Sequence, residues 1–300
     1  MAFQVRSGTF LFKNGTIMIM NEQKKLLTIR ISGAHFSACE YDLRSKEMVP
    51  GTYQRIPHSR KADKTITLKT WRSVLRKIPL DKFKEIGYCA VAVPNNFLDE
   101  NGPFAGWHND FSQPGLKIVI AELTGLSTES IKIYSNAGCF LRGALINRPE
   151  EKDDFVLGMP IGADFTVSIK RESSITDLFL VNPKLRRDFG ELTTCWIMKR
   201  YYQLTGISVL NVKDLNNMYH THSMAKKVMT EFCDQLSQFF IQVKNRYPVK
   251  SIILAGELNF SPQLFATLLK AAHPSKLLLG NPVELSTHLG ACLFFAEDRN

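Results

Sequence analysis

The sequence predicts a mixed α/β protein built as two lobes. Its 300 residues are enough for two domains or for one large two-lobed body, since one domain usually spans about 100–200 residues. Short apolar runs predict buried strands, and longer amphipathic segments between them predict helices. Because this alternation of strand and helix occurs in both halves of the chain, each half is expected to form a sheet packed against helices.

The first half begins with strands. Apolar residues flank Asn14-Gly15, the dipeptide that best signals a two-residue type I′ turn, so residues 9–20 are predicted to form a hairpin. The later strands of this half are expected at runs of apolar and β-branched residues, namely 26–32, 36–43, 86–94 and 130–134. Its helices are expected at 70–86, with an interruption near Pro79, and at 114–124. A strand, a helix and a strand in that order predict a parallel crossover.

The second half repeats this pattern. Its strands are expected at 155–157, 165–169, 251–255 and 277–279, and its helices at 191–204, 222–246, 261–272 and 285–296. In the long helix, apolar residues recur every four positions from Met224 to Phe240, which places them on one face. No linker rich in glycine, proline or serine divides the chain, and the boundary between the lobes is expected near residues 125–130.

Composition excludes several classes of protein. Hydrophobic residues make up 44% of the chain and charged residues 22%, proportions typical of globular proteins and not of disordered or collagen-like ones. The apolar runs at 118–121 and 291–296 fall far short of the ~20 residues needed to cross a bilayer, and residues 1–10 lack the apolar core of a signal peptide. We therefore expect a soluble cytoplasmic protein with no membrane partner. The six cysteines include no Cys-x-x-Cys pair, so reduced thiols and no structural zinc are expected.

The net charge of +10 is concentrated in one segment. Residues 51–88 contain ten lysines and arginines against three acidic residues, so this segment carries +7 of the total. A basic segment can bind nucleic acid, an anionic membrane surface or an acidic protein. A solvated helix face is the simpler interpretation, and nucleic acid is therefore not the expected partner.

Three glycine-centred turns each follow a predicted strand. They contain Gly33, the pair Gly158 and Gly162, and Gly256 followed by Glu257. Glycine allows the backbone to turn tightly and to direct its N–H groups at an anion. In their order across two α/β halves, these turns resemble the phosphate-1, phosphate-2 and adenosine turns of the actin/hexokinase superfamily. More narrowly, the chain resembles the ROK family of bacterial sugar kinases and repressors. Beyond the turns, this resemblance extends to residues 89–111, 123–143, 251–272 and 287–297.

The resemblance covers about residues 26–297 and implies a two-lobed actin-like ATPase (ribonuclease H-like) fold with a cleft between the lobes. Residues 1–128 would form the N-terminal lobe with its extra hairpin, 129–284 the C-terminal lobe, and 285–300 a last helix that packs back on the first lobe. The implied ligand is a sugar or a nucleotide, with ATP and Mg²⁺ as cofactors only if kinase activity is retained. Proteins of this family commonly form oligomers, so the resemblance also implies a homo-oligomer.

The sequence departs from the family pattern at the residues that would do the chemistry. The first turn of the family has an aspartate that helps to hold Mg²⁺, whereas this chain has Arg30, which cannot coordinate a cation but could neutralise a phosphate. Asn136 stands at the position of the family's catalytic aspartate, and an amide cannot accept the proton of the sugar hydroxyl. In the second turn, Pro160 lacks a backbone donor and Asp164 would repel a phosphate. The candidates for phosphate or nucleotide binding are Arg30, Gly33, Gly158, Gly162, Gly256 and Glu257.

The candidate sugar contacts are few. His108 and Asn109 follow Trp107 in a segment expected to border the cleft, Asn136 lies at the catalytic position, and Glu191 matches the one family glutamate that remains before a helix. The family's zinc motif has no match, so no metal site is expected. Three functions stay open: a pseudokinase that binds a sugar or nucleotide or acts as a regulatory protein, a divergent active hexose kinase, and a basic module that binds acidic partners or nucleic acid.

Overall fold

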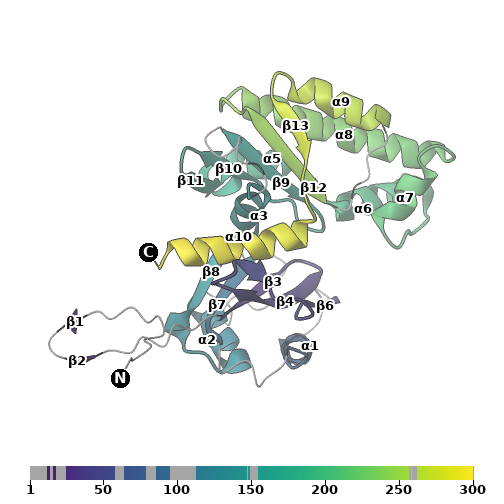
Figure 1. Cartoon of the computed structure of the whole chain (residues 1–300). Helices are drawn as coiled ribbons and strands as arrows, with labels where there is room; N and C mark the ends of the chain where they lie inside the picture. Colours follow the sequence, from purple (N-terminus) through teal and green to yellow (C-terminus); the bar gives the residue numbers. More distant parts are fainter. Residues whose placement is uncertain are drawn as a thin grey trace.

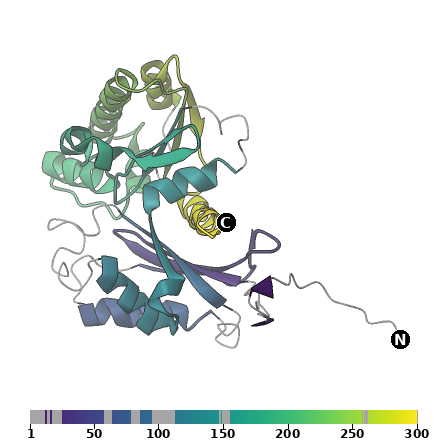
Figure 2. The same ribbon diagram turned by 90° about the vertical axis from the view of Figure 1, so that its left-hand side faces the viewer.

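The computed structural model describes two lobes and the helices that join them. The described residues are 25–57, 64–78, 86–94, 113–146, 148, 155–256, 258 and 262–299, with the backbone of 12–13 and 16–17. Figures 1 and 2 show two α/β bodies, one above the other, with helices α3 (Asn136–Ala144) and α10 (Val283–Glu297) between them. The short strands β1 (Phe12–Lys13) and β2 (Thr16–Ile17) pair antiparallel, as the hairpin prediction requires.

The first lobe is a six-stranded mixed sheet. Its strands are β3 (Lys25–Ile31), β4 (His35–Asp42), β5 (Glu47–Met48), β6 (Gln54–Pro57), β7 (Ile86–Val93) and β8 (Ile131–Ser135). They lie in the order β5-β4-β3-β7-β8, with β6 also paired to β4. Strand β4 is antiparallel to its neighbours, whereas β3, β7 and β8 run parallel. Helices α1 (Lys64–Leu75) and α2 (Gln113–Thr124) cover one face through a buried cluster that includes Trp71 and Ile120.

The second lobe repeats this topology. Its strands are β9 (Val156–Ile161), β10 (Ser168–Arg171), β11 (Ser174–Asp177), β12 (Ser251–Gly256) and β13 (Lys276–Leu279), in the order β11-β10-β9-β12-β13. As in the first lobe, the earliest strand is central, with an antiparallel neighbour on one side and a parallel neighbour on the other. Its helices are α4 (Leu178–Val181), α5 (Pro183–Phe189), α6 (Thr194–Thr205), α7 (Val212–Met218), α8 (Ser223–Lys244) and α9 (Pro262–Ala272). The predicted apolar face of α8 is buried in the core of this lobe, with Phe232 and Phe240 fully enclosed.

Helices α3 and α10 each join one lobe and pack against the other. Helix α3 continues directly from β8 of the first lobe, but its Phe140 packs with Ile253 of β12 in the second. Helix α10 follows β13 of the second lobe, but its Phe295 packs against Tyr88 of β7 in the first, with ring centroids 5.2 Å apart. The chain therefore crosses between the lobes twice.

Two glycines allow α3 and α10 to cross in backbone contact. A Cβ added at Gly290 would lie 1.7 Å from the carbonyl oxygen of Cys139, and one added at Gly143 would lie 1.9 Å from the carbonyl oxygen of Ser286. Both distances are far shorter than van der Waals contact, so no other residue fits either position unless a helix moves. The absence of a side chain at Gly143 and Gly290 thus sets the separation of the two helices.

Most of the predicted elements are confirmed to within a few residues. The confirmed strands are 26–32, 36–43, 86–94, 130–134, 251–255 and 277–279, and the confirmed helices are 114–124, 191–204, 222–246, 261–272 and 285–296. The crossover from β7 to β8 is parallel, as predicted. The elements not predicted from the sequence are β5, β6, β11, α4, α5 and α7. Within the described residues, no helix combines the length and the apolar character needed to span a bilayer.

Two boundary predictions are wrong. The basic helix expected at 70–86 is α1, which begins at Lys64, ends at Leu75 and contains early β-branched residues that lower helix propensity. The strand expected at 155–157 continues to Ile161 as β9, so Gly158 lies inside a strand and not in a turn. Pro160 is tolerated there because the ladder between β9 and β10 ends at Gly158, so the missing N–H of the proline removes no hydrogen bond from that ladder.

Replacing Gly290 with alanine is expected to destabilise the fold. The new Cβ would overlap the Cys139 carbonyl, so α10 must shift, and overpacking of this kind costs about 1–3 kcal/mol or more. Urea unfolding followed by circular dichroism measures the loss. Gly162→Ala is the matched control, because its added Cβ meets nothing within 4 Å, and should leave the free energy of unfolding within about 0.5 kcal/mol. Equal stability of the two variants would contradict the close helix crossing.

Candidate functional site

The candidate site is a cleft between the two lobes. Its volume is about 610 Å³, within the ~300–1,000 Å³ that is common for small-molecule sites. The first lobe contributes the turn between β3 and β4 and part of β6, and the second contributes the turn after β9 and the start of α6. The N-terminal ends of α3 and α10 also line the cleft, so its wall is formed by both lobes and by the helices that join them.

The turn between β3 and β4 is organised by Ser32. The Ser32 hydroxyl accepts hydrogen bonds from the N–H groups of Ala34 (3.4 Å) and His35 (3.0 Å) and donates one to the carbonyl of His35 (3.1 Å). The N–H of Gly33 instead donates to the carboxylate of Asp164 at 2.6 Å. Because Asp164 belongs to the second lobe, this hydrogen bond spans the cleft.

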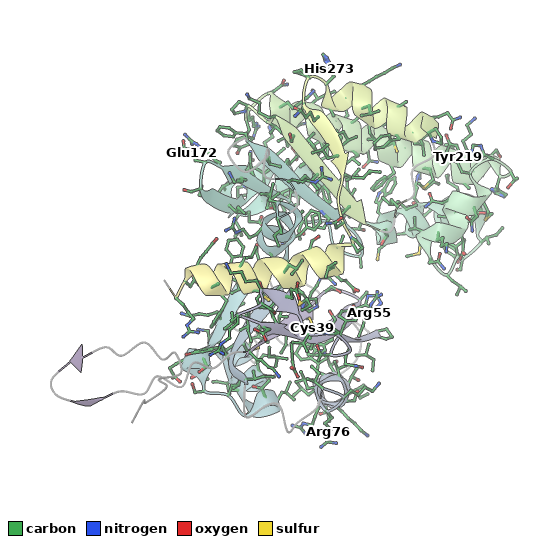
Figure 3. The ribbon with its side chains drawn as sticks, in the orientation of Figure 1. Cys39, Arg55, Arg76, Glu172, Tyr219 and His273 are labelled. Carbon is green, nitrogen blue, oxygen red and sulfur yellow. The ribbon has the colours of Figure 1, made fainter. Side chains whose placement is uncertain are left out.

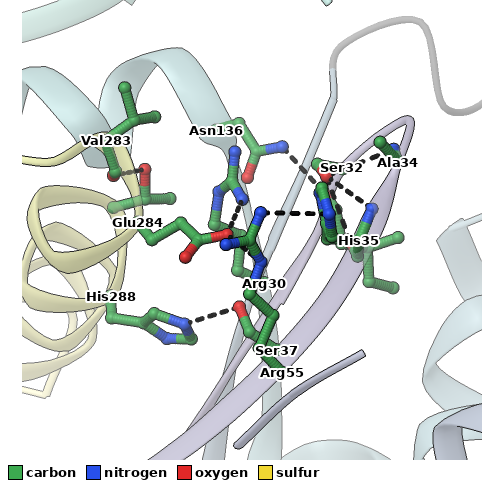
Figure 4. Close-up of polar contacts among 12 residues, drawn as sticks. Arg30, Ser32, Ala34, His35, Ser37, Arg55, Asn136, Val283, Glu284 and His288 are labelled. Atoms are coloured by element: carbon green, nitrogen blue, oxygen red, sulfur yellow. Dashed lines mark hydrogen bonds and ion pairs between the residues drawn. The ribbon is translucent and has the colours of Figure 1, made fainter. Parts of the chain in front are cut away.

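Arg30, at the end of β3, belongs to a charged cluster. Its Nη1 lies 3.4 Å from Oε1 of Glu284 in the first turn of α10, and the Nε of Arg55 lies 3.0 Å from the same oxygen. Tyr53 donates a hydrogen bond of 2.5 Å to the other oxygen of Glu284. Burial lowers the pKa of Arg30, while the charges of Glu284 and Asp164 raise it, and a guanidinium stays charged at neutral pH in any case. Figure 4 shows the Arg30 and Glu284 side chains side by side.

Asn136 is the first residue of α3 and is only 6% exposed. Its Nδ2 donates a hydrogen bond of 2.8 Å to the carbonyl of Ile31, the residue that ends β3. Its Oδ1 is buried and has no hydrogen-bond partner among the described residues. The side chain lines the cleft, so this acceptor is available to a ligand there.

The second turn is tied to helix α6. The N–H of Gly162 donates to the carbonyl of Asp164 at 3.2 Å, and the carbonyl of Gly162 accepts from the N–H of Thr194 at 2.8 Å. These bonds hold Asp164 where its side chain reaches the first turn. Met159, which precedes the turn, is buried in the core of the lobe, whereas Pro160 lines the cleft.

The remaining candidates from the sequence are dispersed. Gly158 is packed against α3, where an added Cβ would lie 2.8 Å from the Cβ of Leu141, and it does not line the cleft. Gly256 lies at the end of β12, has a φ of 149° and does line the cleft. Glu191 is exposed and lines a neighbouring cavity of about 730 Å³ on the second lobe. His108, Asn109 and Glu257 lie outside the described residues.

The acidic partner of the charged cluster was not predicted from the sequence. Glu284 receives contacts from Arg30, Arg55 and Tyr53, yet it follows Pro282 in a segment without a recognisable motif. The one available signal is its place in the first turn of a helix, where a carboxylate is favoured by the helix dipole. Within the described residues, no three His, Cys, Asp or Glu side chains are grouped as metal ligands.

A buried histidine attaches α10 to the first lobe. Hydrogen bonds of 2.9 Å join His288 Nδ1 to the hydroxyl of Thr28 and His288 Nε2 to the hydroxyl of Ser37. Figure 4 shows His288 directed from α10 toward Ser37. Burial lowers the pKa of His288 to about 3, and the charge of Arg30 contributes to the shift. The imidazole is therefore neutral near pH 7 and holds α10, with Glu284 one turn earlier, against the sheet.

Several solved structures share this architecture. No protein-family model matches the sequence, and no curated protein matches it. A candidate N-acetylmannosamine kinase from Listeria monocytogenes is 17% identical, with a TM-score of 0.70 over 92% of this chain and 100% of that one. The ROK family glucokinase of Streptomyces griseus, solved with glucose and AMPPNP, is 10% identical, with a TM-score of 0.62 over 90% and 98% of the two chains. A ROK family transcriptional regulator, a homologue of the E. coli MLC protein, is 12% identical, with a TM-score of 0.65 over 92% and 79%.

The repeated sheet topology, the two crossing helices and the cleft define a two-lobed actin-like fold. More narrowly, the chain has the fold of ROK sugar kinases and ROK regulators. The fold implied by the sequence resemblance is therefore confirmed. Identities of 10–17% show the fold alone, so the ligands and activities of those proteins remain theirs.

Lowering the pH from 7 to 5 is expected to destabilise the protein through His288. Its pKa is about 3 when folded and about 6.5 when unfolded, so the unfolded chain binds more protons between these values. Stability from this group is complete above pH 6.5 and falls by about 1.4 kcal/mol per pH unit as the pH drops toward 3. Urea unfolding at pH 7 and 5 measures the slope. His288→Gln should flatten it, whereas the exposed His220→Gln should not; equal slopes in all three proteins would contradict the assignment.

Proposed function

We propose that this protein is a pseudokinase, which binds a sugar or a nucleotide in the cleft and does not transfer a phosphoryl group. The hydrogen bond from Asn136 to Ile31 carries the proposal. The amide stands at the position that the resemblance assigns to the catalytic base, and its N–H is engaged by a backbone carbonyl at 2.8 Å. The Nδ2 of this residue therefore binds the backbone of the first lobe and is not directed at a ligand.

An amide at position 136 removes the proton acceptor that sugar phosphorylation needs. General base catalysis contributes about 10²–10⁴ to a rate, and an amide cannot provide it. The surroundings are also adapted to an amide, since a carboxylate at position 136 would set a second acceptor against the Ile31 carbonyl. Restoring the carboxylate would therefore cost stability as well as introduce the base.

The positively charged side chain at position 30 disfavours the binding of the Mg²⁺ ion that a kinase requires. Mg²⁺ needs oxygen ligands, and in phosphoryl transfer it bridges the phosphates and neutralises their charge. The Arg30 guanidinium has no acceptor and is positively charged, and its ion pair with Glu284 holds it in place. The change from a metal ligand to Arg30 is thus independent of the change at Asn136.

Two buried polar atoms support ligand binding. Asn136 Oδ1 and Arg30 Nε both lack a hydrogen-bond partner among the described residues, and both residues line the cleft. A buried acceptor or donor without a partner costs about 1–3 kcal/mol. Hydroxyl groups both donate and accept, so a sugar or a ribose in the cleft would satisfy both atoms. A protein that binds such a ligand without turnover has the property that a sensor or regulator needs.

The unmodified protein is expected to show no phosphorylation of glucose, N-acetylglucosamine or N-acetylmannosamine with MgATP in a coupled ADP-release assay. Asn136→Asp alone should also stay inactive, because the metal-holding aspartate of the first turn is still missing, and should unfold at a lower temperature. A thermal-shift panel of hexoses, ATP and ADP, with and without Mg²⁺, tests binding, since a ligand of the native state raises the melting temperature.

Asn211→Asp is the matched control for the introduced charge. Asn211 also lines the cleft, but it is exposed and caps α7, a position where aspartate is equally suitable. This variant should melt as the unmodified protein does. Sugar-dependent turnover of the unmodified protein at roughly 1–10³ s⁻¹ would contradict the pseudokinase proposal and favour the divergent active kinase.

The exposed face of α1 favours a second function, the binding of nucleic acid. Lys69 and Arg72 of α1 are exposed, as is Arg76, whose N–H bonds to the Arg72 carbonyl just beyond the helix; their spacings of three and four residues place them in one stripe, while Trp71 and Val74 of α1 are buried. Residues 64–78 contain no acidic residue to neutralise the stripe. Figure 3 shows Arg76 at the outer end of the first lobe, away from the cleft.

If the α1 stripe binds duplex DNA, the affinity should fall steeply with salt because phosphate counterions are released. Reversing Lys69, Arg72 and Arg76 to glutamate should then reduce the slope of log K against log salt by about 2–3, as measured by fluorescence anisotropy. Reversal of the exposed Lys226, Lys227 and Lys270 on the second lobe is the control with equal charge change and should have little effect. Equal losses in both triple variants would remove the α1 stripe as the binding surface.

A further inference from the structure

The two turns that face each other across the cleft carry opposite charges. Arg30 is the next-to-last residue of β3, the strand that leads into the first turn, and Asp164 ends the second turn. The Asp164 carboxylate accepts the Gly33 N–H at 2.6 Å, and its negative charge also stabilises the charged form of Arg30. The turns therefore attract each other, although the residues in contact are 131 positions apart in the sequence.

The contact at Gly33 has the chemistry of an anion site. A backbone N–H that donates to a carboxylate at 2.6 Å makes a short, charge-assisted hydrogen bond. A phosphate oxygen uses the same donors as a carboxylate oxygen, namely backbone N–H groups and guanidinium groups. The carboxylate of Asp164 thus fills a position that a phosphate oxygen would otherwise be able to fill.

We propose that Asp164 is the built-in occupant of this anion position and that it excludes phosphate groups from it. The proposal rests on the proposed function in one respect, that the cleft is the ligand site. The ligand of the unmodified protein therefore binds in the cleft without a phosphate group at the first turn. The same hydrogen bond joins the lobes, so Asp164 also holds the cleft in its present width.

The charge balance of the cleft supports this assignment. Two cations, Arg30 and Arg55, face two carboxylates, Glu284 and Asp164, so the charges close to the first turn cancel. A phosphate placed beside Asp164 would add a like charge within hydrogen-bond distance of an existing carboxylate, which is unfavourable. Without Asp164 the same turn keeps an excess of positive charge, and the Gly33 N–H loses its carboxylate acceptor.

Asp164→Ala is expected to create a phosphate site where the unmodified protein has none. Inorganic tripolyphosphate, without metal, is the probe, and isothermal titration calorimetry measures its binding. The variant should bind it at least about tenfold more tightly than the unmodified protein, with an affinity that falls as salt rises. Asp234→Ala, an exposed acid of α8, removes the same charge at a distance from the cleft and should bind as the unmodified protein does.

Hydrogen exchange of the Gly33 amide provides a readout that does not depend on a ligand. The amide should exchange faster in Asp164→Ala than in the unmodified protein, because its acceptor is gone, and should not change in Asp234→Ala. Asp164→Asn keeps the shape of the side chain and a neutral acceptor, so it should show intermediate exchange and intermediate tripolyphosphate affinity. If Asp164→Ala fails to fold, Asp164→Asn tests the proposal by the same two measurements.

Two results would overturn the proposal: tripolyphosphate binding by the unmodified protein as tight as by the Asp164 variants, or Gly33 exchange that is the same in all proteins. Neither measurement involves turnover. Phosphorylation of a sugar by the unmodified protein would instead contradict the proposed function, so the two failures are distinguishable.

Discussion

The backbone contact between α3 and α10 determines the geometry around the cleft. Both helices begin at the cleft, and each is covalently joined to one lobe and packed against the other. Because Gly143 and Gly290 leave no side chain between them, the first turns of the two helices are held at a fixed separation. Asn136 on α3 and Glu284 on α10 therefore both reach β3, at Ile31 and Arg30. The hydrogen bond and the ion pair of the site are consequences of how the helices cross.

The repeated topology explains why the two turns meet. In each lobe the central strand is the earliest one, and a turn follows it, at 32–34 after β3 and at 162–164 after β9. When two such lobes face each other, equivalent turns lie on opposite walls of one cleft. In this chain one wall presents a cation and a backbone donor, and the other presents a carboxylate. Complementary charges therefore connect the two walls of the cleft.

Local pattern was sufficient to predict most of the fold. The run 86–94 and the face from Met224 to Phe240 identify a strand and a helix because burial depends on the periodicity of nearby residues. Gly158 was misplaced because glycine and a nearby proline favour a turn locally, whereas pairing with β12 on one flank stabilises a strand. Pairing of this kind depends on residues far away in the sequence.

The site was predictable only in part, for the same reason. Arg30 and Asn136 were identified because a resemblance gave their positions a meaning. The hydrogen bond of Asp164 and the three contacts of Glu284 have no local signature, since they join residues 131 and more than 200 positions apart. The same local sequence allows a loop carboxylate to be solvated or to be paired across a cleft. Only the tertiary arrangement distinguishes these outcomes.

The exchange of α3 and α10 between the lobes has a consequence for synthesis on the ribosome. The sheet of the first lobe is complete once β8 has been made, but α10 covers one of its faces, where Leu26, Ala90 and Ala92 are buried. Translation adds about 5–20 residues per second, so the roughly 150 residues between β8 and α10 take on the order of 10 s. During this interval an apolar face of the nascent sheet has no cover. The first lobe to emerge is therefore the last to be finished, and its exposed face is the part of the chain most open to association with a chaperone.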